Sequence, residues 1–350
     1  MSRENSTATT DDLHDDVTIR TTEMHTSGEP VRIIESGFPH PVGSTVLEQL
    51  DYTRQHLDDY RRLLMLEPRG HFDMFGALLV KPKIAEADIG VIFLHNNGYS
   101  NMCGHAVIAL ARYAVDKGLV TSRTCPETKL AIECPCGLVR AFVQFDGEKT
   151  GSVRFRSVPA FVLEADVVVD VEGFGKVKVD ISYGGVFYAL VSAKTLALNL
   201  NTACARDVAY AADAVSAAVK SQVEISHPES SGLNYLMGTI VTDGQDRFSE
   251  DATTNICIFA DRQVDRAPCG SGVTARVALQ HHKALIHLGQ VRRFQSGTTG
   301  GIFTGKVVEE TTCGGYKSVI VEVSGKAFYM GSNVFTWEAD DQLGRGFLVR

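Results

Sequence analysis

The sequence has no apolar run long enough to cross a membrane. Its longest apolar stretches, at residues 74–80 and 90–94, are much shorter than the ~18 residues that a membrane-spanning helix needs. Basic residues are also few, because 34 Lys and Arg stand against 42 Asp and Glu, and the net charge is −8 with no long basic run. We therefore expect a soluble protein whose main partner is neither nucleic acid nor a membrane surface.

Features of a targeting segment are missing from residues 1–16, which read MSRENSTATTDDLHDD. This stretch has neither the apolar centre of a secretory signal nor the Arg-rich amphipathic pattern of a transit peptide. We expect residues 1–16 to form a disordered polar tail and the protein to be cytoplasmic.

Disulfide and zinc-finger patterns are missing too. Eight cysteines in 350 residues are too sparse for a disulfide scaffold, and a cytoplasmic chain would keep them reduced. Cys134 and Cys136 are spaced C-x-C near Cys125, but no C-x-x-C or H-x-x-x-H pair follows at zinc-finger distance. The alternating residues around them predict a β-hairpin that turns at Cys134-Pro-Cys-Gly137.

A nucleotide site is not expected either. Residues 300–306, GGIFTGK, have the G-x-x-x-x-G-K spacing of a phosphate loop. However, Val307 stands where the hydroxyl residue that binds magnesium should be. The residues after it have the pattern of a strand rather than a helix.

An internal repeat is present. A strand-like run, GVIFLH at residues 90–95, leads through a loop to Asn101-Met-Cys-Gly-His105 and then to an apolar stretch of helical length. NICIFA at residues 255–260 leads in the same way to Asp265-Arg-Ala-Pro-Cys-Gly-Ser-Gly272 and a second helical stretch. The two cysteines are 166 residues apart. A unit of this size is a domain rather than one turn of a solenoid.

The composition, 44% hydrophobic and 22% charged, is typical of a globular protein, and at ~150 residues per domain a chain of 350 favours two domains. Helices are expected after each Cys-Gly pair, ending at Gly118 and Gly289, and at residues 45–65 and 207–223. Most other runs have the pattern of strands.

We predict an α/β fold of two pseudo-symmetric domains, at residues 17–165 and 166–350. Each would be a mostly antiparallel or mixed sheet wrapped round a central helix, with the active site between the domains. The boundary should lie near residues 161–171, and the C-terminal strand is free to return to the first domain.

The duplicated Cys-Gly pair suggests acid–base chemistry. A cysteine at the first turn of a buried helix lies at the positive end of the helix dipole, which lowers the pKa of its thiol below the free value of ~8.5. The glycine lets the backbone approach a ligand, and the free N–H groups of the first turn bind anions. Two such helix ends would hold one carboxylate, with a thiol on each face of the neighbouring carbon. One thiolate would remove the α-proton while the opposite thiol protonates the other face, without a cofactor.

A single Cys-Gly pair is more often a buried structural thiol followed by a turn. Two pairs at matching positions of a repeat favour a functional role, and His105 and Asp265 are expected to direct polar groups into the cleft beside them. Two other classes stay open at this point. A non-catalytic amino-acid-binding protein has no need of two thiols, and a redox protein would want the C-x-x-C pair that is absent.

The motifs Asn101-Met-Cys-Gly-His105 and Asp265-Arg-Ala-Pro-Cys-Gly-Ser-Gly272 resemble the signatures of the proline racemase family, which includes 4-hydroxyproline 2-epimerases and trans-3-hydroxy-L-proline dehydratases. The similarity extends to Met24-His-Thr-Ser-Gly-Glu-Pro30, Tyr183-Gly-Gly-Val-Phe-Tyr188 and Phe303-Thr-Gly305, so it covers nearly the whole chain from about Val17. It implies two pseudo-symmetric α/β halves like those of diaminopimelate epimerase.

The resemblance also implies roles for individual residues. Cys103 and Cys269 would be the paired acid/base thiols. Backbone N–H groups of Gly104, His105, Gly270 and Ser271 would bind the substrate carboxylate, and His105 with Asp265 would hold the ring nitrogen. The substrate would be a small proline-type imino acid, no cofactor or metal is implied, and the protein would be a homodimer.

One position departs from the most similar branch of the family. Stretches such as CPCGLV and TTNICIFADRQVDR resemble the trans-3-hydroxy-L-proline dehydratases most closely, yet that branch has Thr where this chain has Cys269. A dehydratase needs only one base, because the 3-hydroxyl leaves after the α-proton is taken. Cys269 therefore favours a cofactor-independent racemase or 2-epimerase of proline or hydroxyproline. The alternative is a trans-3-hydroxy-L-proline dehydratase that uses Cys103 as base.

Overall fold

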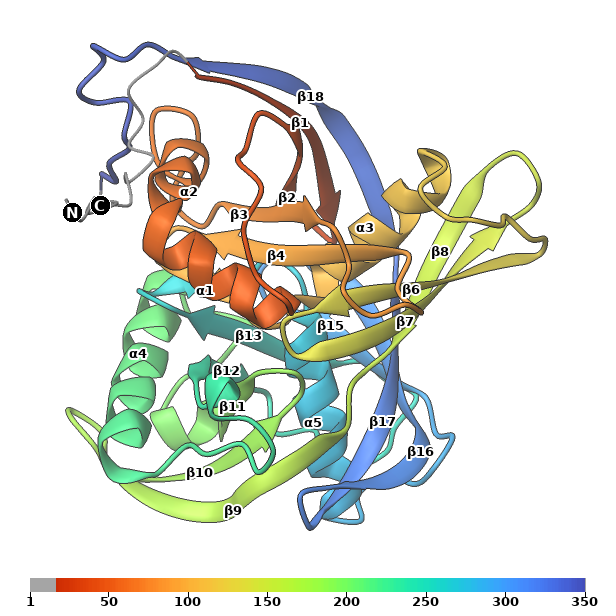
Figure 1. The fold of residues 1–350 in the computed structure, drawn as a ribbon. Coiled ribbons are helices and arrows are strands. Elements are labelled where there is room, and N and C mark those ends of the chain that lie inside the picture. Colours follow the sequence, from red (N-terminus) through yellow and green to blue (C-terminus); the bar gives the residue numbers. More distant parts are fainter. Residues whose placement is uncertain (1–16, 350) are drawn as a thin grey trace, which may run out of the picture.

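The structure is a computed structural model that describes residues 17–349 of the chain. The tail predicted at residues 1–16 lies outside the described residues. Figure 1 shows two bodies of sheet, one above the other, each with a helix in its middle. These helices are α3 (Gly104–Asp116) and α5 (Gly270–His282), and both are buried along most of their length.

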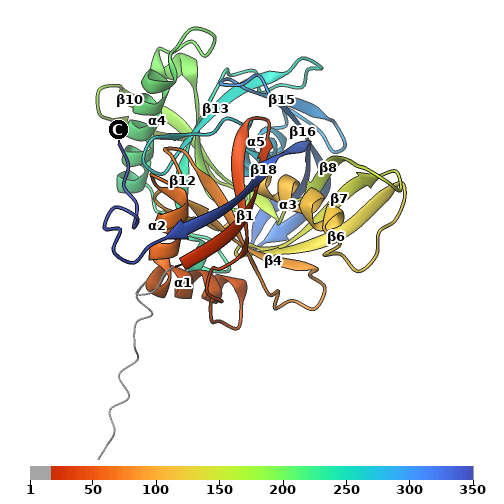
Figure 2. The ribbon, with the colours of Figure 1, turned by 90° about the horizontal axis from the view of Figure 1, so that it is seen from above.

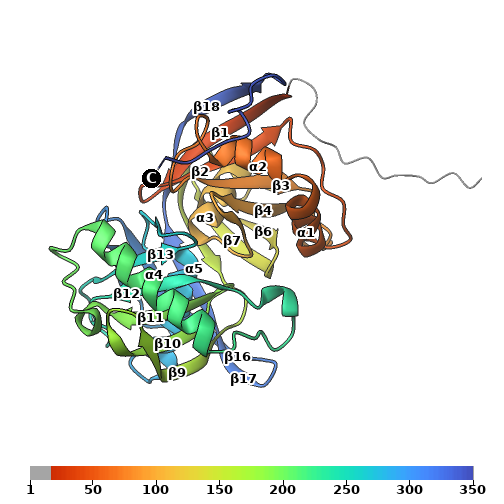
Figure 3. The same cartoon turned by 90° about the vertical axis from the view of Figure 1, so that its left-hand side faces the viewer.

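The lower body, called here the second half, is a closed barrel around α5. Its strands are β9 (Ala160–Val171), β10 (Gly175–Tyr183), β11 (Phe187–Ser192), β12 (Leu236–Thr242), β13 (Thr253–Phe259), β14 (Gln263–Val264), β15 (Arg292–Ser296), β16 (Ile302–Cys313) and β17 (Tyr316–Gly325). Apart from the short β14, which pairs only with β13, each strand pairs with the next, and β17 pairs back with β9. Helix α4 (Ala205–Gln222) connects the parallel strands β11 and β12 and covers the outside of the barrel (Figure 3).

The upper body, called the first half, repeats this strand order around α3. Its elements are β1 (Val17–Thr26), β2 (Glu29–Ser36), α1 (Val46–His56), α2 (Asp58–Met65), β3 (Phe75–Val80), β4 (Ile89–His95), β5 (Gly98–Ser100), β6 (Glu127–Cys134), β7 (Gly137–Phe145), β8 (Thr150–Arg156) and the last strand, β18 (Ala327–Trp337). The parallel pairs β2–β3 and β4–β6 match β11–β12 and β13–β15 of the barrel.

Two strand pairings join segments that are far apart in the sequence. The C-terminal strand β18 pairs with β1 along its whole length, and Figure 2 shows the two strands side by side. Strand β8 pairs with β17, so that the two halves share one hydrogen-bonded sheet. The predicted α/β fold, with a sheet wrapped round a helix in each half, is confirmed.

Several local predictions are also confirmed. Strands β6 and β7 form the expected hairpin, with Cys134 paired to Gly137. Helix α3 ends just before Gly118, whose φ of 70° stops a helix, and α4 lies where residues 207–223 were expected to be helical. The stretch with phosphate-loop spacing runs into strand β16.

Two helix predictions were wrong in their extent. Residues 45–65 form two helices rather than one, because Leu57 has φ −126° and ψ 14° and the carboxylates of Asp58 and Asp59 favour a new helix N-terminus there. Helix α5 ends at His282 instead of Gly289, since Ala284 adopts a left-handed φ of 54°. Among residues 17–349, no helix is both long and apolar enough to span a membrane.

Candidate active site

The N-termini of α3 and α5 meet between the two halves. A Cβ atom on Gly104 would lie 2.5 Å from the Cα of Gly270, and a Cβ on Gly270 would lie 2.6 Å from the Cα of Gly104. Only glycine permits this approach. Because Cys103 and Cys269 directly precede these glycines, the contact brings both thiols to one place.

A cavity lies at this contact. It is lined by Glu29, Phe75, Met102, Cys103, Gly104, His105, Tyr188, Met237, Cys257, Phe259, Asp265, Cys269, Gly270 and Ser271. All seven site residues predicted from the sequence are therefore in its wall. Its volume is about 20 Å³, which is room for about one water molecule, so the walls must move apart to admit a ring carboxylate.

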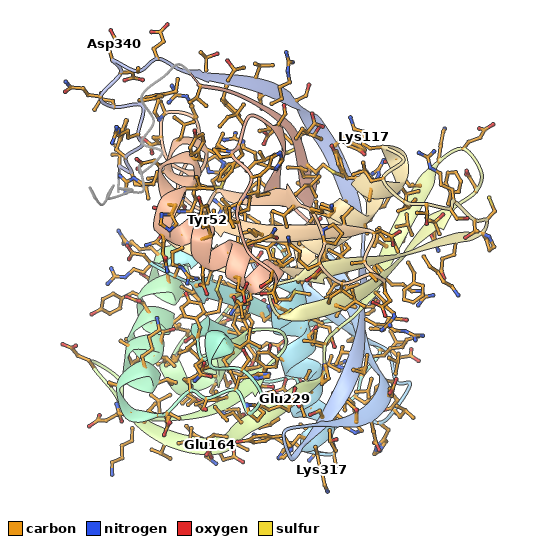
Figure 4. All side chains as sticks on the ribbon, in the orientation of Figure 1. Tyr52, Lys117, Glu164, Glu229, Lys317 and Asp340 are labelled. Atoms are coloured by element: carbon orange, nitrogen blue, oxygen red, sulfur yellow. The ribbon has the colours of Figure 1, made fainter. Side chains whose placement is uncertain are left out.

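The two thiols in the cavity wall are buried, unlike the side chains of the outer surface. Figure 4 shows labelled charged side chains, such as Lys117, Glu164 and Lys317, projecting outward from the molecule. By contrast, Cys103 and Cys269 are each only 5% exposed. Interactions between charged groups in such a site are stronger than they are in water.

Cys103 faces a histidine. Its Sγ lies 3.2 Å from His105 Nδ1, and His105 Nε2 lies 3.2 Å from the carbonyl oxygen of Pro30. That carbonyl can only accept, so Nε2 carries the proton and Nδ1 accepts from the thiol. Burial lowers the pKa of His105 to about 3 and raises the pKa of Cys103 well above its usual value. The free protein therefore holds Cys103 as a thiol beside a neutral imidazole.

Cys269 faces hydrogen-bond donors instead. Hydrogen bonds from the Cys257 thiol and from Tyr188, whose Oη is 3.4 Å from Cys269 Sγ, outweigh burial and lower the pKa of Cys269 to about 7. Tyr188 in turn lies 2.9 Å from Ser271 Oγ. Cys269 also adopts a left-handed φ of 67°, whereas φ of Cys103 is −145°. The lowered pKa expected at both helix ends thus occurs at Cys269 only.

Two buried carboxyl groups share the cavity. Asp265 accepts the backbone N–H of Ala267 at 2.7 Å, and Glu29 accepts that of Arg266 at 2.6 Å. Burial raises the pKa of Asp265 well above its usual range and that of Glu29 to about 8. Glu29 also favours the protonated state of Asp265, since like charges repel.

Three side chains of the cavity have the atoms that could bind a metal ion close together. These atoms of Cys257, Asp265 and Cys269 all lie within 4.8 Å of one another. The cysteines whose spacing was compared with a zinc finger, Cys125, Cys134 and Cys136, do not line this cavity. The trio in the cavity accounts for the hydrogen bonding of Cys269, because a protonated neighbour donates to its sulfur.

Sequence reasoning did not assign roles to three polar residues of the cavity. Glu29 and Tyr188 lie inside stretches that carry the family resemblance, and Cys257 lies in the strand before the second motif. Their position in such stretches was the available signal. Their proximity to the thiols depends on strand pairing over long range, which the sequence does not display.

Comparison with known proteins bears on this site. The sequence profile described as proline racemase matches residues 21–348. The chain belongs to the proline racemase family. It is 56% identical over 337 residues to the trans-L-3-hydroxyproline dehydratase of Xenopus tropicalis, covering 96% of this chain and 97% of that protein. It is 44% identical over 333 residues to the 3-hydroxyproline 2-epimerase of Burkholderia multivorans, covering 95% and 98%.

A solved member of the family shares the fold. The crystal structure of a hydroxyproline epimerase from Agrobacterium vitis, with bound trans-4-hydroxy-L-proline, matches with a TM-score of 0.90 at 28% identity, covering 97% of this chain and 96% of that one. Proline racemase family members therefore include a hydro-lyase and isomerases. Cys269 led us to favour an isomerase, but the relative at 56% identity is a dehydratase, so the comparisons support the dehydratase alternative better.

Proposed function

We propose that this protein dehydrates trans-3-hydroxy-L-proline, without a cofactor, and begins by removing the α-proton of the bound imino acid. The observation that carries the first step is the pair of thiols brought to one cavity by the Gly104–Gly270 contact. The dehydration is supported by the 56% identity to a dehydratase over nearly the whole chain.

The proposed binding mode uses the two helix ends. Backbone N–H groups of Gly104, His105, Gly270 and Ser271 would bind the carboxylate, where charge builds up as the α-proton leaves. Asp265 and His105 would hold the ring nitrogen. Both of these residues line the cavity, although in the free protein His105 is engaged with Cys103 and Pro30.

The proposed base for this substrate is Cys103. The dehydratase branch that the sequence resembles has Thr at the position of Cys269. Of the two thiols, that branch therefore keeps only the one that corresponds to Cys103. In the free protein the proton sits on Cys103 and Cys269 is the more acidic thiol. Substrate binding must therefore shift the proton balance between the two sulfurs before the α-proton is removed.

A second candidate function is 2-epimerisation, which one observation favours. Cys269 lies across the cavity with a pKa of about 7, so it can exchange a proton near neutral pH. After removal of the α-proton, a thiol on the opposite face would reprotonate the carbon and invert it. Both functions share the removal of the α-proton and differ in the next step, which is either loss of the 3-hydroxyl or reprotonation of the carbon.

We also propose a homodimer of two-domain chains, on the family resemblance. The repeated strand order supports a domain boundary near residue 166, with β18 returning to the first domain.

The test separates products. The protein is incubated without added cofactor in heavy water with L-proline, trans-4-hydroxy-L-proline or trans-3-hydroxy-L-proline, and each reaction is followed by NMR and chiral chromatography. We expect loss of water from the 3-hydroxy compound, giving an unsaturated ring acid that is reducible to proline. Inversion of the α-carbon with deuterium uptake and no loss of water would overturn the dehydratase proposal in favour of the epimerase.

A further inference from the structure

Glu29 lies in the wall of the cavity but has no part in the mechanism described so far. It is the first residue of β2, is fully buried and lines the cavity with Cys103 and Cys269. Its Oε2 accepts the N–H of Arg266, while its Oε1 has no hydrogen-bond partner among the described residues. Burying a polar atom without a partner is costly. The free oxygen therefore indicates a group that meets a ligand.

The surrounding contacts place Glu29 between the elements that carry the two thiols. The turn that joins β1 to β2 rests on the first motif, because Thr26 Oγ1 donates to the His105 carbonyl at 2.9 Å and the Pro30 carbonyl accepts from His105. Glu29 itself bonds to Arg266, which belongs to the second motif. Its carboxyl group is thus held by contacts to both halves.

Dehydration needs a group that donates a proton to the 3-hydroxyl as it leaves. In trans-3-hydroxy-L-proline the hydroxyl and the carboxylate are on opposite faces of the ring, so the hydroxyl and the α-hydrogen leave from the same face. Hydroxide is a poor leaving group, and an acid that protonates it accelerates such a step by about 10²–10⁴-fold.

We propose that Glu29, as a carboxylic acid, protonates the departing 3-hydroxyl. This inference rests on the proposed dehydratase function. The Cys103 thiolate takes the α-proton, the C–H electron pair becomes the C2–C3 double bond, and the C3–O bond breaks. The proton of Glu29 joins the departing oxygen, which leaves as water. Solvent then reprotonates Glu29 and takes the proton from Cys103, so no oxidant or reductant is needed.

The protonation state suits this role. Burial raises the pKa of Glu29 to about 8 against the lowering effect of Arg266, so the group is mostly a neutral acid at pH 7. The other charged or titratable groups that act on it are Asp73, before β3, and Cys269, both of which also raise its pKa. Glu29 in turn raises the pKa of Asp265 and Cys103, which lie near it.

The first test is Glu29→Gln, which keeps the shape and an acceptor for Arg266 but has no acidic proton. We expect dehydration of trans-3-hydroxy-L-proline in heavy water to fall about 100-fold or more. Deuterium should still enter the α-carbon of the unconverted substrate, because Cys103 is intact. Glu133→Gln is the matched control, since it removes another buried carboxylate, which accepts from Lys83 and Ile84 away from the cavity. Thermal unfolding checks that each variant folds.

Two results would overturn the role of Glu29. If Glu29→Gln dehydrated the substrate at the wild-type rate, another group, such as the newly formed Cys103 thiol, would be the proton donor. Equal loss of dehydration and deuterium uptake with a raised KM would make Glu29 a binding residue. A wild-type protein that removes no water would instead overturn the proposed function, and with it this inference.

A second measurement does not depend on a variant. In the wild-type protein, the ratio of dehydration to deuterium uptake at the α-carbon should fall above about pH 8 as Glu29 loses its proton, because both reactions share the Cys103 base and only dehydration needs the acid. A ratio that stays level from about pH 8 to about pH 9.5 would contradict the proposal.

Discussion

The two halves of the fold present the same motif in opposite chemical surroundings. Cys103 and Cys269 each precede a buried helix of 13 residues, and each lines the same cavity. The Cys103 thiol donates a hydrogen bond to the neutral imidazole of His105. Cys269 receives hydrogen bonds from Cys257 and Tyr188, which stabilise a thiolate. Duplication of a scaffold therefore need not duplicate a protonation state, because the side chains around the helix end decide it.

The difference is useful for proton transfer. Two thiols of equal acidity at close range would not both ionise readily, because their charges repel. Neither would then act preferentially as the base or as the acid. Here Cys103 is a thiol in the free protein, and Cys269, with a pKa of about 7, is the sulfur that ionises near neutral pH. Cys103 must therefore give up its proton when substrate binds before it can act as the proposed base.

Removing the first sulfur should have the largest effect. We expect Cys103→Ser to lower both dehydration and α-deuterium uptake by about 10³-fold, because a serine hydroxyl is too weak an acid to supply the base. Cys125→Ser, at an exposed cysteine, is the control. Steady-state assays measure the dehydration rate, and NMR in heavy water measures the deuterium uptake at the α-carbon. Activity of Cys103→Ser within tenfold of wild type would assign the base to another residue.

Separating the halves at their contact should come next. Gly104→Ala adds a Cβ that meets the Gly270 backbone, so we expect a loss of about 1–3 kcal/mol in the free energy of unfolding, together with reduced activity. Gly331→Ala is the matched control, because open space surrounds a Cβ there. Chemical denaturation of both variants gives the comparison. Equal stability of the two would mean that the helix ends do not touch in solution.

A smaller effect is expected when the second sulfur is replaced. Cys269→Thr introduces the residue that the family resemblance gives to the dehydratase branch, and it removes the anion that helps to raise the pKa of Cys103. Dehydration should stay within about tenfold of wild type, and its rise with pH should move to lower pH. Any inversion of the α-carbon should disappear. Loss of dehydration as complete as in Cys103→Ser would show that both sulfurs serve the same reaction.

The mildest test compares the thiols in the free protein. Iodoacetamide reacts with thiolates, so peptide mass spectrometry should find Cys269 labelled first, with a rate that rises with pH around a midpoint of about 7. Tyr188→Phe removes a donor and should move that midpoint up by about one unit. Faster labelling of Cys103 would reverse the assignment of thiol and thiolate.

The sequence allowed the site to be predicted where the signal was local. The repeat of a strand, a loop and a Cys-Gly pair is visible along the chain, and it led to both thiols, both glycines, His105 and Asp265, while the family resemblance of the second motif added Ser271. The fold class followed from the same repeat. Each of these inferences needed only residues within about one turn or strand of the cysteine.

The remaining features depend on contacts that the sequence does not display. Glu29 reaches the cavity because the β1–β2 turn packs across both motifs, and Cys257 does so through strand β13. The unequal acidity of the two sulfurs arises from these neighbours, whereas the helix dipole alone predicted equality. The break at Leu57 and the early end of α5 at His282 likewise depend on local backbone geometry.

The contact between Gly104 and Gly270 also bears on how the chain arose. These glycines are equivalent positions of the repeat, so the contact is one of a residue with its own counterpart. Self-contact of this kind occurs only on a twofold axis, and it is the mark of an isologous interface between identical subunits. A half-length ancestor pairing through this glycine would already have placed two copies of one cysteine around a single site. Fusion of two copies would then have allowed each cysteine to acquire different neighbours.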